Sequence, residues 1–389
     1  MITLYDKKDC CGCSACVSSC PKHCITLHED SEGFLYPSVD SSACIDCGLC
    51  EKVCPVIHPS AARTPLHVYA AINPDEHIRM KSSSGGIFTL LAEQILHEGG
   101  VVFGARFDEH WEVRHDYTET PEGLAAFRGS KYLQSRMGDT YQTVRKFLND
   151  HRKVLFTGTP CQIAGLYQYL HKPYDNLLTM ECLCFGVPSP LVWRKYLAEK
   201  SPRHTVSHVN FRDKTTGWIG YHLQIQYTSR TESSEAVSQN AFMQGFINKL
   251  YVRPSCHQCP AKHGKSGSDI TVGDYWNIMN VHPELNAGNK GVALVLLNTP
   301  KGETFYKKIV TDSVETTYDE ARQINNGFNE SYEPHPRRTR FFLQLAKAPS
   351  VEALIRRCLK PTCKTRIQQV LQTIKEIIRY KLKQYKILK

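Results

Sequence analysis

The feature that most constrains this chain is a four-cysteine run that occurs twice near the start of the sequence. Residues 44–55 read CIDCGLCEKVCP, and residues 10–21 repeat the same C-x2-C-x2-C-x3-C-P spacing. A cubane of four irons and four sulfides needs a thiolate at each iron, and a tight loop of this spacing supplies three of them. The proline after each run prevents its continuation as a helix. The two runs therefore predict two 4Fe-4S clusters and a chain that moves electrons singly.

In paired runs of this kind, the fourth cysteine of each run binds the other cluster. Disulfides would need an oxidising compartment, and zinc sites prefer one or two C-x2-4-C pairs, so neither explains two identical runs as well. We therefore predict a bacterial-type ferredoxin domain at residues 1–58. Its two ligand sets are Cys10, Cys13, Cys16 and Cys54 for one cluster, and Cys44, Cys47, Cys50 and Cys20 for the other.

Composition limits where such a chain works. Its 389 residues are 41% hydrophobic and 22% charged, which is typical of a soluble globular protein of two or three domains. The start of the sequence has no apolar signal, and no apolar run is long enough to span a membrane. With 17 cysteines, this favours a reducing cytoplasm. The net charge of +10 is concentrated in the tail. Of the 48 Lys and Arg residues, 15 follow position 336, where only two acidic residues occur.

Hydrophobic periodicity predicts a second, larger domain after a proline-containing linker at 56–66. Strands and helices alternate in its first part, which favours a partly parallel sheet, and strands dominate its later part. The fold class is therefore α+β, or mixed α/β: the ferredoxin domain, a larger domain at 66–335 and a basic helical tail at 336–389. The strand order does not follow from the pattern. Strands are expected at 67–73, 101–107, 153–157, 206–212, 223–228, 269–273 and 292–298, and helices at 141–149, 162–170 and 240–250.

The end of the tail, residues 364–389, has apolar residues at helical spacing and basic residues mostly off that face. Such a helix could lie on an anionic membrane surface, dock on a partner or pack on its own body, and periodicity alone leaves these three open. Nucleic acid is not expected as a partner, because the tail offers few stacking aromatics and no groove-reading motif.

Further cysteines and two glycine-containing loops suggest additional cofactors. Cys256 and Cys259 form a C-x2-C pair, Cys161 and Cys184 each follow or lie near a predicted strand end, and Cys182 is close to Cys184 in sequence. These could hold a third cluster, or be ordinary buried cysteines beside a knuckle. Residues 82–86 (SSSGG) precede a helix and could cradle a phosphate, as could 128–132 (RGSKY), although such loops are often only turns.

Seven further motifs follow one another along the chain: SSSGGIFT at 82–89, VVFGARFD at 101–108, RGSKYLQS at 128–135, VLFTGTPCQIAGL at 154–166, CFGVPSP at 184–190, RPSCHQC at 253–259 and SDITVGDYW at 268–276. In this order they resemble the coenzyme F420-reducing hydrogenase/dehydrogenase beta-subunit family, in the bacterial branch that carries an N-terminal two-cluster ferredoxin domain. The resemblance covers about residues 5–300.

The resemblance implies a flavin, FAD, in the larger domain and a third 4Fe-4S cluster close to it. The cluster would take Cys161, Cys184, Cys256 and Cys259, with Cys182 as an alternative to Cys184. Many relatives have C-H-G where this chain has Cys184-Phe185-Gly186, so any role of that histidine is absent here. The implied flavin contacts are Ser84, Gly85, Gly86, Ser130, Lys131, Thr159 and Pro160.

Together these features predict an iron-sulfur flavoprotein oxidoreductase. It would pass electrons from ferredoxin or a partner subunit through the clusters to FAD and on to an organic substrate that the sequence does not identify. The alternative is an electron-transfer subunit of a larger redox complex with no small substrate of its own. No catalytic residue is assigned, and the candidates for proton donor by residue type alone are His222, His257, Tyr275 and Asp274.

Overall fold

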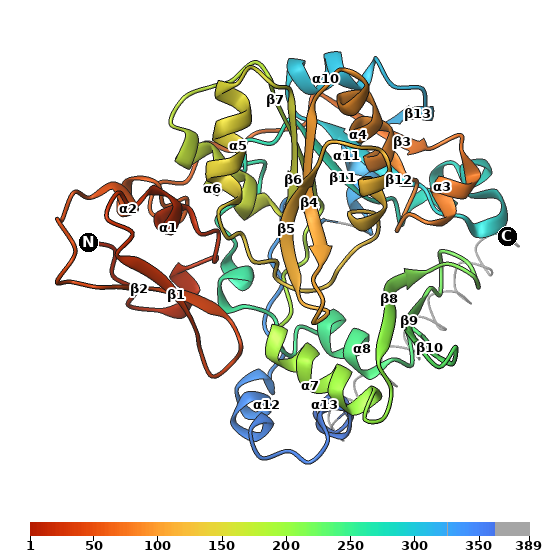
Figure 1. Cartoon of the computed structure of the whole chain (residues 1–389). Helices are drawn as coiled ribbons and strands as arrows, with labels where there is room; N and C mark the ends of the chain where they lie inside the picture. Colours follow the sequence, from red (N-terminus) through yellow and green to blue (C-terminus); the bar gives the residue numbers. More distant parts are fainter. Residues whose placement is uncertain (325, 362–389) are drawn as a thin grey trace, which may run out of the picture.

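The computed structural model describes residues 1–324 and 326–361. Its N-terminal part, red in Figure 1, holds helices α1 (Ala15–Ser19) and α2 (Leu49–Lys52) and the antiparallel hairpin of β1 (Ile25–Glu29) and β2 (Leu35–Val39). Each cysteine run enters its helix through a residue with left-handed backbone, Ser14 (φ 67°) or Gly48 (φ 70°). These sharp turns let three cysteines of one run face a common centre.

The larger part is built on an eight-stranded mixed sheet in the order β13-β3-β12-β11-β7-β6-β4-β5 (Figure 1). Strands β3, β11, β7, β6 and β4 run in one direction, and β5, β12 and β13 run against them. The bounds are β3 (His67–Ile72), β4 (Val101–Phe107), β5 (Val113–Thr118), β6 (Val154–Gly158), β7 (Leu177–Cys182), β11 (Ile270–Asp274), β12 (Ala293–Leu297) and β13 (Asp312–Thr316).

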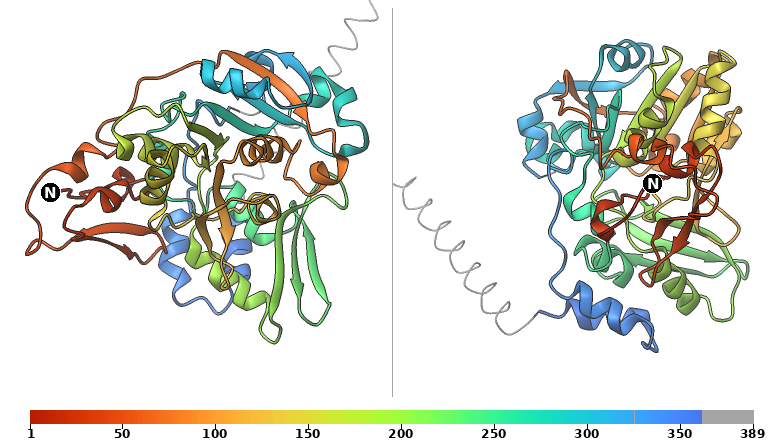
Figure 2. Two further views of the ribbon diagram at one scale, coloured as in Figure 1. Left: turned by 45° about the horizontal axis from the view of Figure 1, so that its top comes forward. Right: turned by 90° about the vertical axis from the view of Figure 1, so that its left-hand side faces the viewer.

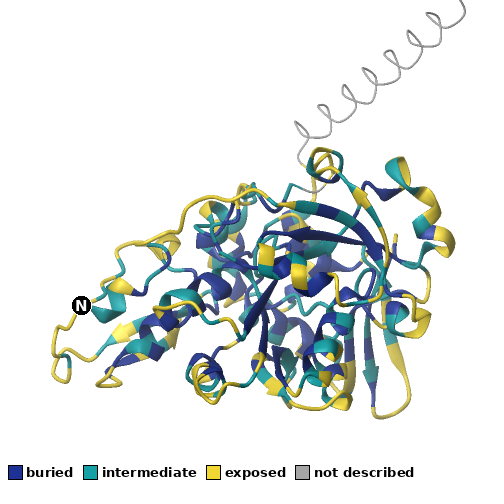
Figure 3. Cartoon of the chain, turned by 90° about the horizontal axis from the view of Figure 1, so that it is seen from above, coloured by how far each residue is buried: buried dark blue, intermediate teal, exposed yellow. Residues whose placement is uncertain are grey.

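Helices cover both faces of this sheet, and its central strands are buried (Figure 3). Val102 of β4 and Leu155 of β6 pack with α4 (Ile87–His97) and α10 (Pro300–Tyr306) on one face. The next residues, Phe103 and Phe156, pack with α5 (Thr140–Asn149) and α6 (Pro160–Leu170) on the other. Because successive side chains of a strand point to opposite faces, this alternation produces two cores.

A smaller layer lies beside the large sheet (Figure 2). The antiparallel strands β8 (Val206–Asp213), β9 (His222–Tyr227) and β10 (Glu232–Ala236) pack with α7 (Pro190–Lys200) and α8 (Ala241–Ile247). Helices α12 (Arg338–Leu345) and α13 (Val351–Leu359) complete this core through Phe341, Leu345 and Ile355. The first part of the basic tail is therefore folded onto the body. The remaining α-helices are α3 (Glu76–Met80), α9 (Ile278–Val281) and α11 (Tyr318–Arg322).

The predicted mixed α/β class is confirmed, and every predicted strand overlaps an observed one. The sequence pattern missed β7, which is central to the large sheet, as well as β1, β2, β5, β10 and β13. The predicted amphipathic helix at 364–389 lies outside the described residues. Within the described ranges, no helix is long and apolar enough to cross a membrane.

Candidate functional site

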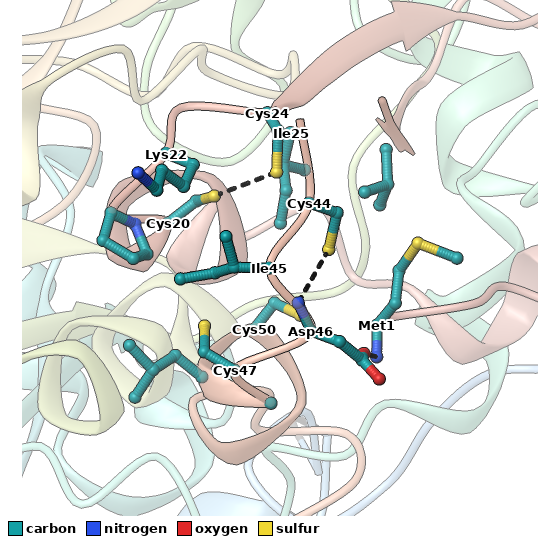
Figure 4. A pocket seen from close by; sticks show the side chains of 14 residues that line it. Met1, Cys20, Lys22, Cys24, Ile25, Cys44, Ile45, Asp46, Cys47 and Cys50 are labelled. Carbon is teal, nitrogen blue, oxygen red and sulfur yellow. Dashed lines mark hydrogen bonds and ion pairs between the residues drawn. The ribbon is translucent and has the colours of Figure 1, made fainter. Parts of the chain in front are cut away.

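The cavity of the second cysteine run lies in the N-terminal part of the chain (Figure 4). Four of its lining thiols belong to the set predicted for one cluster: Cys20, Cys44, Cys47 and Cys50. Two backbone N–H groups donate to these sulfurs, from Asp46 to Cys44 (3.4 Å) and from Ile2 to Cys50 (3.3 Å). A fifth thiol, Cys24, was given no role from the sequence and lies with its Sγ 3.4 Å from that of Cys20.

The other predicted set, Cys10, Cys13, Cys16 and Cys54, also gathers in one place. Burial, together with the charges of Cys10 and Cys54, raises the pKa of the Cys16 thiol to about 12. Burial likewise raises the pKa of Cys54, and Cys10 and Cys50 add to the effect. Cys54 of the second run thus lies with the first run, which is the crossed arrangement expected of paired runs.

A second cavity, named the third cavity below because it would hold the third predicted cluster, collects cysteines from three distant segments. Cys161 is in the first turn of α6, Cys184 follows β7, and Cys256 and Cys259 belong to the 3-10 turn at Pro254–Gln258 and its end. Gly186, with φ 100°, makes the approach possible, since a Cβ there would lie 2.6 Å from Cγ1 of Val252. Cys182 is exposed and does not line this cavity.

The surroundings of this cavity suit an anionic cluster. The buried Lys262 lines it and donates from Nζ to the carbonyl oxygens of Cys184 (2.7 Å) and Gly327. Burial raises the pKa values of Cys184, Cys256 and Cys259, and the charge of Cys161 adds to the effect in each case. Thiolates can share such a site only with a compensating positive charge, which iron supplies. The donor set therefore fits a 4Fe-4S cluster.

A site for a single metal ion needs a different arrangement of ligands from a cluster site. In the described parts of the chain, no group of three or more His, Cys, Asp or Glu side chains is arranged to hold one metal ion. A cubane does not require that arrangement, because each of its thiolates binds a different iron.

The first cysteine set and the third cavity lie against each other. Cys11, unassigned from the sequence, lines the third cavity, and its thiol interacts with those of Cys13 and Cys161. Gly165 of α6 also touches Cys13, since a Cβ at Gly165 would lie 2.9 Å from the Cβ of Cys13. Only a residue without a side chain permits this approach.

Buried ion pairs and hydrogen bonds fix the N-terminal part to the body. Arg253, which is fully buried, donates to the carbonyl oxygens of Cys10 (2.9 Å) and Leu35 (2.9 Å) and to Oε1 of Gln134 (2.8 Å). Arg338 forms a two-pronged ion pair with Glu32 at the tip of the β1–β2 hairpin. Such forked contacts restrict orientation as well as distance.

The predicted flavin contacts fall into two groups at the carboxyl edge of the parallel strands. The loop between α3 and α4 contains Ser84, Gly85 and Gly86. The backbone N–H of Ser130 donates to Oγ of Ser83 (2.7 Å), which joins this loop to the one at 128–132. In contrast, Thr159 and Pro160, after β6, line the third cysteine cavity. Crevices at this edge of open α/β sheets are common ligand sites.

Lys131 and Ser84 are each held by backbone oxygens in the structure. Lys131 Nζ donates to the carbonyls of Arg128 and Gly129 (both 3.1 Å), and burial, together with Arg106, lowers its pKa to about 7. Ser84 Oγ donates to the carbonyl of Val292 (2.7 Å). A flavin phosphate at this edge would therefore depend mainly on backbone N–H groups of the loops.

Two buried charged residues of this part of the chain were not found from the sequence. Arg212 of β8 pairs with both oxygens of Asp274 (2.8 and 2.9 Å) and donates to the carbonyl of Ser83 (2.9 Å). Burial raises the pKa of Glu181, at the end of β7, to about 7. Isolated charged residues inside strands carry no spacing signal, so only the folded chain brings them to the site.

The four proton-donor candidates occupy different settings. Asp274 is paired with Arg212 beside the Ser83 loop, and His257 Nδ1 contacts the carbonyl oxygen of Tyr332 (2.6 Å) next to Cys256. His222 contacts Ser234, and Tyr275 contacts Thr316, both by side-chain hydrogen bonds of 2.9 Å. Only Asp274 and His257 are therefore near the predicted cofactor residues.

Comparison with known proteins assigns the family. A 4Fe-4S dicluster domain matches residues 9–57, which include all eight cysteines of the two runs. The N-terminal domain of the coenzyme F420 hydrogenase/dehydrogenase beta subunit matches residues 68–140, and the C-terminal domain of the same subunit matches residues 151–322. The chain belongs to this beta-subunit family.

Relatives of this beta-subunit homologue include two proteins of Methanocaldococcus jannaschii. An uncharacterized protein is 25% identical over 356 residues, covering 82% of this chain and 91% of its own. The coenzyme F420-dependent sulfite reductase is 25% identical over 201 residues, which are 50% of this chain and 30% of that enzyme. A 7Fe ferredoxin of Hydrogenibacillus schlegelii is 46% identical over 43 residues, 11% of this chain and 49% of the ferredoxin.

One solved structure is also similar to the beta-subunit homologue. A chain of the F420-reducing NiFe hydrogenase complex from Methanosarcina barkeri matches 80% of this chain over 93% of its own length, with 15% identity and a TM-score of 0.46. The predicted family is thus confirmed by the domain matches, and the chain is an iron-sulfur protein of a redox-enzyme family.

Proposed function

We propose that this beta-subunit homologue is an iron-sulfur flavoprotein oxidoreductase, which takes electrons from ferredoxin or a partner redox subunit and delivers them through FAD to an organic substrate. The observation that supports it most is the third cavity, where cysteines from three segments meet directly beside the first cysteine run. An isolated electron carrier has no need of such a site.

The proposed ligands follow the three groups of cysteines. The first cluster would be held by Cys10, Cys13, Cys16 and Cys54, the second by Cys44, Cys47, Cys50 and Cys20, and the third by Cys161, Cys184, Cys256 and Cys259. Cys184 is preferred to Cys182 because Cys184 lines the cavity. Clusters exchange single electrons and a flavin exchanges one or two, so together they supply the means to convert a one-electron supply into two-electron chemistry.

The chain's own residues would hold these groups in a fixed relation. Arg253 ties the backbone of Cys10 to the body, and Gly165 lets α6 approach Cys13 closely. Thr159 and Pro160 connect the third cavity to the carboxyl edge of the sheet, where Ser84, Gly85, Gly86, Ser130 and Lys131 are the proposed flavin contacts.

Anaerobic purification followed by iron, sulfide and flavin analysis tests this proposal. About 12 irons and one FAD per chain are expected, at four irons per cubane. About eight irons with no flavin would overturn both the third cluster and the flavin site.

A second candidate function is an electron-transfer subunit of a larger complex, without a small-molecule substrate of its own. The comparison with the sulfite reductase favours it. The region that matches this chain makes up only 30% of that enzyme, so a similar region is part of a larger redox protein there. This candidate predicts a bound flavin that reduced ferredoxin reduces, with no turnover of conjugated organic acceptors until a partner subunit is added. Turnover by the chain alone would exclude it.

A further inference from the structure

Helices α12 and α13 lie at the outer side of the smaller layer (blue in Figure 2). A basic hollow lies between them. Its volume is about 240 Å³. Four cationic side chains line it: Arg337 and Arg340 from the start of α12, and Arg357 and Lys360 from the end of α13. None of its described lining residues is acidic.

Two of these cations are held in place by neutral partners. Arg337 Nη1 donates to the carbonyl oxygens of Cys358 (2.6 Å) and Lys360 (2.7 Å), so its guanidinium caps the C-terminus of α13. Arg357 Nη2 donates to Oε1 of Gln344 (2.8 Å), which also lines the hollow. Because neutral groups accept these bonds, the positive charges are positioned without being neutralised.

The charges nearby do not offset this field. Glu352, the one acid within α12 and α13, is paired with Arg356 and Lys200 and does not line the hollow. Burial raises the pKa of the Cys358 thiol, while Arg357, Arg337 and Arg340 all act to lower it, so this buried sulfur has three cations as its charged neighbours. The N-terminus of α12, which no side chain of the described residues caps, adds its partial positive charge.

From this arrangement we infer that the hollow between α12 and α13 is a binding site for a phosphate-bearing ligand, either a soluble diphosphate or monoester or a phosphorylated lipid headgroup. Three guanidinium groups suit a phosphate because its several oxygens accept forked hydrogen bonds. Its double charge also relieves the repulsion among the four cations more than a single carboxylate would. The site is separate from the cysteine cavities and from the carboxyl edge of the large sheet.

The soluble source is tested by titrating the full-length protein with inorganic diphosphate in a calorimeter, in phosphate-free buffer. The Arg340→Gln/Arg357→Gln variant removes two exposed lining cations and leaves the Arg337 cap intact. The matched control, Lys347→Gln/Arg356→Gln, removes the same charge from residues that do not line the hollow. We expect one diphosphate site in the wild-type chain, weakened about tenfold or more in the first variant and less than about twofold in the control.

The lipid source is tested by flotation with phosphatidylcholine vesicles that contain phosphatidic acid. If the ligand is a headgroup, the first variant will lose far more vesicle binding than the control, and diphosphate will bind weakly or not at all. Equal behaviour of the two variants in both experiments would overturn the inference, because binding would then depend only on net charge. Unchanged circular dichroism and iron content establish that both variants fold.

Discussion

Arg253 and Cys10 are 243 positions apart in sequence, yet Nε of Arg253 donates to the carbonyl oxygen of Cys10 at 2.9 Å, and its Nη2 lies 3.6 Å from the sulfur. The same guanidinium lies over the ring of Tyr36 at 4.3 Å. The charge of Arg253 acts to lower the pKa of Cys161, and the charges of Cys11 and Cys256 act to raise the pKa of Arg253. A buried, permanent cation is therefore placed between the first cysteine set and the third cavity.

Replacing Arg253 should make the adjacent first cluster, and the proposed third cluster, harder to reduce. A reduced cluster carries one more negative charge, which the guanidinium stabilises, so Arg253→Met should shift the midpoint potential to more negative values by on the order of 60 mV, about 1.4 kcal/mol per electron. Arg253→Lys keeps the charge and should show a smaller shift. Anaerobic redox titration followed by electron paramagnetic resonance measures both. Equal potentials in the wild type and Arg253→Met would contradict this electrostatic role.

Cys184 and Cys182 provide a matched pair of substitutions, because only Cys184 lines the third cavity. Cys184→Ser should reduce the iron content from about 12 to about 8 per chain, since loss of one ligand destabilises one cubane. Cys182→Ser should leave it at about 12. Iron analysis of the two purified variants decides the assignment, and the reverse pattern would make Cys182 the ligand.

The two N-terminal clusters could be predicted because their ligands are close in sequence. A C-x2-C-x2-C-x3-C-P run spans only 12 residues, so its pattern can be recognised locally. The turns at Ser14 and Gly48 lie within these runs. In the third cavity, by contrast, 72 positions separate Cys184 from Cys256. From spacing alone, Cys256 and Cys259 could form a knuckle, and the other cysteines could be ordinary buried residues. Only the family resemblance predicted that they share one cluster.

Other parts of the site depend on contacts that no local pattern carries. Strand β7 was missed, although its residues 177–182 supply the sheet that places Cys184. Cys11 was left without a role, but packing of the N-terminal part on α6 brings it into the third cavity. Cys358, which the sequence places in the basic tail, is a free thiol buried in the core that α13 completes.

The ion pair of Glu32 and Arg338 should contribute to docking of the N-terminal part. Both side chains are largely buried, 17% and 13% exposed, and make two hydrogen bonds. In a double-mutant cycle of Glu32→Gln and Arg338→Met, we expect an interaction free energy of about 1–3 kcal/mol. Urea midpoints of the loss of cluster absorbance supply the four values. Strict additivity of the two single changes would show that the pair makes no net contribution.

His115 predicts a specific dependence of stability on pH. The residue is buried, with Nε2 3.0 Å from the carbonyl oxygen of Thr157 and Nδ1 2.9 Å from Oγ of Ser135. Burial lowers its pKa from 6.5 to about 4. Between these values the unfolded chain binds the proton and the folded chain does not, so the free energy of unfolding falls as the pH drops from 6.5 towards 4.

The His115 contribution can be isolated by substitution. The loss approaches about 3 kcal/mol at the acidic limit, since each pKa unit corresponds to about 1.4 kcal/mol. A His115→Gln variant keeps a polar side chain that cannot titrate, so it should be less stable at pH 7 but lose less stability than the wild type between pH 6.5 and 5. Urea unfolding followed by tryptophan fluorescence at these two pH values measures the difference. Parallel losses in both proteins would show that His115 does not resist protonation in the fold.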